Sequence, residues 1–149
     1  MIRANPQIRN FAERLVVYET GGDKKVGTKP SAAFDGCEKL RPQLVTLMGN
    51  GGYRALLGRA LALAGEELPW LRRVHVNADA SLAGLEEFHT QFDSVEFFEG
   101  GVLLLSRLLG LLVTFIGENL TLRLMRQSWP NIPLNNLAFD DGNQREKAE

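Results

Sequence analysis

The stretch GGVLLLSRLLGLLVTFIG, residues Gly100 to Gly117, decides which fold the chain can adopt. Only Ser106, Arg107 and Thr114 are polar in these eighteen residues, so the stretch just reaches the length of a membrane-spanning helix. An arginine near the middle of such a helix costs about 2.5 to 3.5 kcal/mol to insert into a bilayer. We therefore expect a buried bundle helix and no membrane span, with a peripheral membrane contact as a further alternative.

The polar side chains of this helix fall within one narrow sector when residues are placed about 100° apart. They are Arg107, Thr114, Glu118 and Thr121. The stripe either faces water or, if neighbouring helices cover it, requires charged partners. Arg107 and Glu118 are eleven residues apart. Because that separation is about 16 Å along a helix, they need separate partners, and Arg54 or Arg59 could serve the glutamate.

Two glycines flank this sector, Gly110 and Gly117, one heptad apart. Glycine lets a second helix approach closely, and that helix could come from the same chain or from a second subunit. The resulting candidate interaction or pocket site consists of Arg54, Arg107, Gly110, Thr114, Gly117 and Glu118.

Apolar residues recur at spacings of three and four in most of the chain, which predicts an all-α fold. We expect a single-domain bundle of about five helices around a long central helix in the C-terminal half. Helices are predicted from Asn5-Pro6 to Thr20, from Ser31 to Leu47 with a kink or break at Pro42, from Tyr53 to Leu68, from Ser81 to Asp93, and unbroken from near Val95 to near Gln127.

Two local patterns refine this picture. Gly58, Ala62 and Gly65 fall near one another on a helical projection, which predicts close approach of a neighbouring helix. The alternation in Val74-His75-Val76 allows at most one short β element near residues 74–76.

The domain division follows from the change of composition after Pro130. We expect a helical domain over residues 1–130 and a polar C-terminal tail over residues 131–149, partly disordered or packed back. An apolar string in this tail could lie across the domain or dock on a partner. It consists of Ile132, Leu134, Leu137 and Phe139.

Composition excludes several classes of function. The 149 residues include 17 basic and 18 acidic side chains, a net charge of -1, which gives no global positive field for a nucleic-acid partner. Cys37 is the single cysteine, so the chain can form neither an internal disulfide nor a multi-cysteine metal site. Met1 to Pro6 lack the apolar stretch of a secretory signal. We expect a cytoplasmic protein.

The motifs of common enzymes are incomplete in this sequence. Glu86 and His89 have the Glu-x-x-His spacing of a di-iron half-site, but the second copy that such a centre needs is missing. His75, Glu86 and His89 are therefore only a secondary polar candidate. We expect no metal, no cofactor and no catalytic residue, and Gly49 to Arg54 are interpreted as helix caps.

These observations favour a non-catalytic helical protein-interaction or adaptor module, whose partner is another protein or a second copy in a homodimer. The alternative is a ligand-binding or sensory domain, with a small molecule in a polar pocket between helices where Arg54, Arg107 or Glu118 converge. A small enzyme built around His75 or His89 is the third hypothesis.

Overall fold

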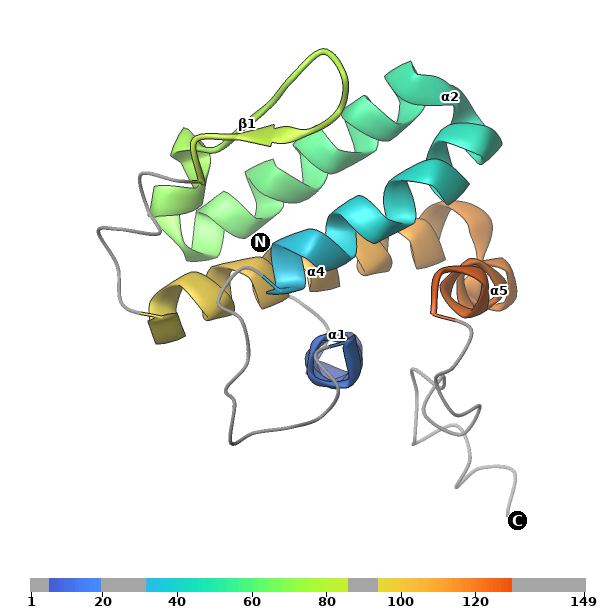
Figure 1. The fold of residues 1–149 in the computed structure, drawn as a ribbon, viewed down its shortest axis with the longest axis horizontal. Helices are drawn as coiled ribbons and strands as arrows, with labels where there is room; N and C mark the ends of the chain where they lie inside the picture. The colour runs from blue at the N-terminus through green and yellow to red at the C-terminus, as the bar shows by residue number, and fades with distance from the viewer. Residues whose placement is uncertain (1–5, 20–31, 86–93, 130–149) are drawn as a thin grey trace.

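The computed structural model describes residues 6–19, 32–85 and 94–129 (Figure 1). The elements in chain order are α1 (Pro6–Glu19), α2 (Ala32–Glu67), the 3-10 helix η1 (Pro69–Arg73), β1 (His75–Val76), β2 (Leu82–Ala83), α4 (Ser94–Ile116) and α5 (Glu118–Ser128). The predicted all-α class is confirmed. Within the described ranges there are four α-helices, where about five were expected.

The central helix is α4, as predicted. Its packing with α2 is the most extensive in the structure, and α1 and α5 contact it as well. Every residue from Gly101 to Leu109 is buried. Figure 1 shows α1 and α5 nearly end-on, so both run across the direction of α2 and α4. This arrangement surrounds the leucine-rich middle of α4 with apolar side chains, which explains why this part of the helix has almost no polar residues.

The prediction of one unbroken helix to Gln127 is wrong, because α4 ends at Ile116 and α5 begins at Glu118. Gly117 between them has φ 88° and ψ 161°, a conformation that is essentially reserved for glycine. Its carbonyl then accepts hydrogen bonds from the backbone N–H of Thr121, at 3.1 Å, and from the Thr121 hydroxyl, at 2.7 Å. Periodicity alone could not reveal this change of direction.

The second helix also bends at a glycine, and not at the predicted proline. α2 continues through Pro42, and its non-helical residue is Gly49, with φ 79° and ψ 162°. Tyr53 follows one turn later, is fully buried, and donates a hydrogen bond of 3.1 Å to the Cys37 carbonyl in the preceding arm. Burial raises the pKa of the Tyr53 hydroxyl. The two predicted helices are therefore two arms of α2 joined at Gly49.

A small antiparallel hairpin, β1 paired with β2, follows η1 (Figure 1). Two strands replace the single β element expected near residues 74–76, and the helix predicted from Ser81 does not begin there. The Asp79 carboxylate accepts hydrogen bonds from the Ser81 backbone N–H at 3.0 Å and hydroxyl at 2.6 Å, which closes the turn. These bonds lower the pKa of Asp79. The rest of the predicted helix lies mainly at 86–93, outside the described residues.

Of the small residues Gly58, Ala62 and Gly65, only Gly65 lies against a neighbouring helical element, the 3-10 helix η1. Apart from the adjoining residues and backbone of its own helix, nothing in the described residues lies within 4 Å of the position that a Cβ on Gly58 would take, and Ala62 is exposed. Gly65 instead accommodates the Arg72 side chain of η1. The tightest glycine is Gly100, where a Cβ would overlap the Trp70 ring.

Candidate functional site

Arg107, in the middle of α4, is a buried charge with only 5% of its surface exposed. Its Nη2 donates a hydrogen bond of 2.5 Å to Oε2 of Glu67, the last residue of α2. The Glu67 side chain remains 34% exposed, so the carboxylate keeps contact with water while it neutralises the guanidinium. Sequence reasoning did not identify Glu67 as the partner, because the pairing depends on how α2 lies across α4.

The other polar residues of the predicted stripe differ in their exposure to solvent. Thr114 is exposed, and its hydroxyl donates to the Gly110 carbonyl at 3.0 Å. Glu118 is exposed in the first turn of α5, where the helix dipole favours a negative charge. Thr121 is buried. The stripe is thus open to solvent around Thr114 and Glu118, between its buried ends at Arg107 and Thr121.

Arg54 contacts the turn of the β1–β2 hairpin and not the polar stripe of α4 and α5. Its Nε donates to the Asn77 carbonyl at 3.1 Å. Two further side chains of α2 hold the same turn, since Arg41 Nη1 donates to the Asp79 carbonyl at 2.7 Å and Asn50 Nδ2 to the Ala78 carbonyl at 3.0 Å. Arg54 therefore anchors the turn to α2 and pairs with neither Glu118 nor Glu67.

An apolar hollow lies between α2 and the end of α4. It has a volume of about 250 Å³ and is lined by Met48, Gly52, Ala55, Leu56, Arg59 and Phe115, which together we call the Phe115 patch. The Phe115 side chain is 63% exposed, although phenylalanine usually lies inside a protein. Sequence reasoning missed this residue because it assigned every apolar side chain of α4 to the core; the neighbouring Thr114 and Glu118 were the available signal.

Gly110 lies in the last two turns of α4, and Gly117 follows the last residue of that helix. Apart from adjoining residues and the backbone of its own helix, nothing in the described residues is within 4 Å of a Cβ position at either glycine. The close packing within the chain that one alternative envisaged is therefore missing at both, as far as residues 6–19, 32–85 and 94–129 extend.

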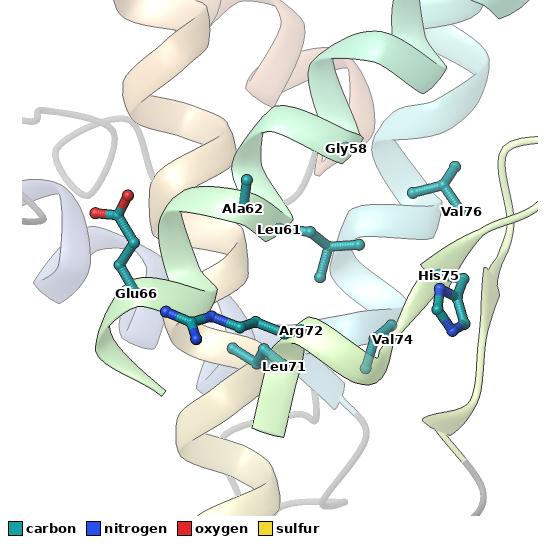
Figure 2. Close-up of a pocket in the computed structure, with 9 residues that line it drawn as sticks. All are labelled: Gly58, Leu61, Ala62, Glu66, Leu71, Arg72, Val74, His75 and Val76. Atoms are coloured by element: carbon teal, nitrogen blue, oxygen red, sulfur yellow. The ribbon is translucent and has the colours of Figure 1, made fainter. Parts of the chain in front are cut away.

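A further cleft lies between the second arm of α2 and the segment from η1 to β1 (Figure 2). This α2–η1 cleft has a volume of about 580 Å³ and is lined by Gly58, Leu61, Ala62, Glu66, Leu71, Arg72, Val74, His75 and Val76. Figure 2 shows Leu61 and Val74 between Arg72 on one side and His75 on the other. The structure thus gives an apolar cleft with Glu66 and Arg72 toward one end and His75 toward the other.

The secondary polar candidate is only partly described. His75 is exposed at the rim of the α2–η1 cleft, whereas Glu86 and His89 lie outside the described residues. Cys37 is buried in the apolar core. Among the residues that the structure describes, no group of three or more His, Cys, Asp or Glu side chains could hold a metal ion.

One helix of the described chain, Val95–Ile116, is long and apolar enough to cross a membrane by length and composition alone. Its most apolar window has a mean hydropathy of 1.8 and is 61% buried inside the protein. A core helix of a soluble protein passes the same test, so this property alone is weak evidence for a span.

Comparisons with models of protein families, with curated proteins and with solved structures found no match to this chain.

Removal of the Glu67 carboxylate is expected to destabilise the fold more than removal of Arg107. Glu67→Gln takes the negative charge from a buried guanidinium and should lower the free energy of unfolding by about 2 to 4 kcal/mol. Arg107→Met leaves no buried charge and should remain within about 1 kcal/mol of the wild type. Chemical denaturation measures both values.

The matched control is Glu99→Gln, which breaks the more exposed ion pair between Arg9 and Glu99. Exposed ion pairs contribute little to stability, so this variant should lower the free energy of unfolding by less than about 1 kcal/mol. If Glu67→Gln and Glu99→Gln lowered the free energy of unfolding equally, the structural importance of the buried pair would be contradicted.

Proposed function

We propose that the protein is a non-catalytic helical interaction module, an adaptor that binds another protein chain through the Phe115 patch. The observation that carries the proposal is the exposed Phe115 side chain beside a hollow lined almost entirely by apolar groups. A large apolar ring exposed to water is unfavourable unless a partner covers it, and aromatic side chains are enriched at the centres of protein interfaces.

Neighbouring residues support the same interpretation. Leu47, next to Met48 of the patch, is 46% exposed and adds a further large apolar side chain beside the bend of α2 at Gly49. Among the described residues that line the hollow, Arg59 is the only charged one. An apolar centre with charge at its edge is the usual composition of a protein-binding surface.

We further propose that α4 is a core helix and that the module acts in the cytoplasm. The buried Arg107 pairs with Glu67 on one side of α4, so a bilayer around this helix would have to accommodate a charge pair. Cys37 is the single cysteine, so the chain forms no internal disulfide that would require an oxidising compartment.

A photo-crosslinking amino acid at position 115, in protein expressed in its native host, tests the proposed function. We expect a crosslinked protein with the probe at position 115 and none with the probe at Val95, which is 68% exposed near the other end of α4. Purified partner should then bind the wild type and Val95→Glu, but not Phe115→Glu. Crosslinking that is equal at both positions, or missing at position 115, would overturn the proposal.

The α2–η1 cleft favours a second candidate function, the binding of a small amphipathic anion. Its walls at Leu61, Leu71 and Val74 are apolar and buried. Arg72 at one end has no ion pair within the described residues and could bind a carboxylate. Glu66 also lines the cleft and offsets part of the Arg72 charge, so the apolar walls would contribute most of the affinity for an aliphatic carboxylate of medium length.

Calorimetric titration with decanoate tests this second candidate. Binding should be lost in Gly58→Leu, whose side chain would enter the cleft, and weakened about tenfold in Arg72→Gln. The control is Gly51→Leu, because Gly51 does not line the cleft and also has open space at its Cβ position. Unchanged binding by Gly58→Leu would exclude the cleft as the site.

A further inference from the structure

We infer that the partner at the Phe115 patch is a second copy of this chain, bound about a two-fold axis with Phe115 of each copy in the hollow of the other. This inference rests on the proposed function and adds the identity of the partner. In a two-fold interface the same surface faces itself, so the surface must carry both a projecting group and a matching depression.

The Phe115 patch has both features. Phe115 projects into solvent, and the hollow beside it has a volume of about 250 Å³. A cavity of about 150 Å³ already holds benzene, so an aromatic ring from a second copy fits. Because Phe115 also forms one wall of the hollow, the two rings would meet near the axis, where an offset or edge-to-face contact adds to the apolar burial.

The patch also has one charged residue of each sign beside it, so two copies related by a two-fold axis can pair opposite charges. Arg59 lines the hollow, and Glu118 follows Phe115 by three residues, just beyond Gly117. Both side chains are exposed and neither has an ion pair within the described part of the chain. Insertion of Phe115 brings Glu118 of one copy toward Arg59 of the other. The two-fold axis forms this pair twice, which sets the orientation of the copies.

The rest of this end of α4 is compatible with burial under a second copy. Gly110 presents no side chain, and the space around its Cβ position is open. The Thr114 hydroxyl already donates to the Gly110 carbonyl, so covering it leaves no unpaired donor. Gly52 and Ala55 on α2 are equally small. Close approach of the two copies therefore has neither a steric obstacle nor an unpaired threonine donor at these residues.

Sedimentation of the purified full chain over a range of concentrations tests the inference. The wild type should show a reversible equilibrium between monomer and dimer. Phe115→Asp should be monomeric throughout, and Val95→Asp, on the same helix, should dimerise as the wild type does. Because Phe115 is exposed, both variants should retain the helical circular dichroism spectrum of the wild type.

A charge reversal gives a second measurement that does not depend on Phe115. Arg59→Glu and Glu118→Arg should each weaken the dimer about three- to tenfold, and the double variant should recover most of that loss, since opposite charges face each other again. Absence of recovery, or a dimer that Phe115→Asp leaves intact, would overturn the inference.

A wild type that is monomeric at all concentrations would also overturn it. The photo-crosslinking result separates this failure from that of the proposed function. A crosslink from position 115 to a different protein would retain the interaction module and exclude the second copy, and no crosslink at that position would exclude both.

Discussion

The burial of α4 by α1, α2 and α5 is the constraint on which the rest of the structure depends. A helix with leucine or valine at most positions from Val102 to Leu109 can avoid water only if neighbours cover all of its sides. Covering it also buries Arg107, whose charge then requires a carboxylate. The end of α2 supplies that carboxylate through Glu67, so the apolar packing and the buried ion pair determine together where α2 lies.

The same helix leaves the core before it ends. From Gly110 to Ile116 the side chains of α4 are half-buried or exposed, with Leu112 as the exception. Apolar residues that continue into this exposed part produce the Phe115 patch, and Gly117 then turns the chain into α5. A single sequence feature, an apolar run that continues beyond the covered part of α4, therefore accounts for both the core and the proposed binding surface.

Sequence patterns predicted the helical class and the central helix because both follow from side-chain periodicity, which is local. The change of direction at Gly117 and the bend at Gly49 escaped prediction, since a glycine within a periodic stretch is compatible with a continuous helix and with a positive φ angle. The β2 strand was missed because a two-residue strand has no period of its own and exists only by pairing with β1.

The candidate site was predicted less completely than the fold, since it depends on contacts between distant segments. Arg107 was identified as a charge in need of a partner, but Glu67 lies forty residues away in sequence. Thr114 and Glu118 were placed on one helical sector with Gly110 beside it, and the structure leaves these three positions open, whereas Arg107 and Thr121 of the same sector are buried. Phe115 has the same residue type as core positions, and only tertiary structure distinguishes an exposed phenylalanine from a buried one.

Amide hydrogen exchange in detergent-free buffer tests the central position of α4 most directly. If α4 is the interior helix of a folded protein, the amides from Val102 to Leu109 exchange more slowly than any others and only through global unfolding. Rapid exchange in this segment, or a chain that stays dispersed only in detergent, would contradict it.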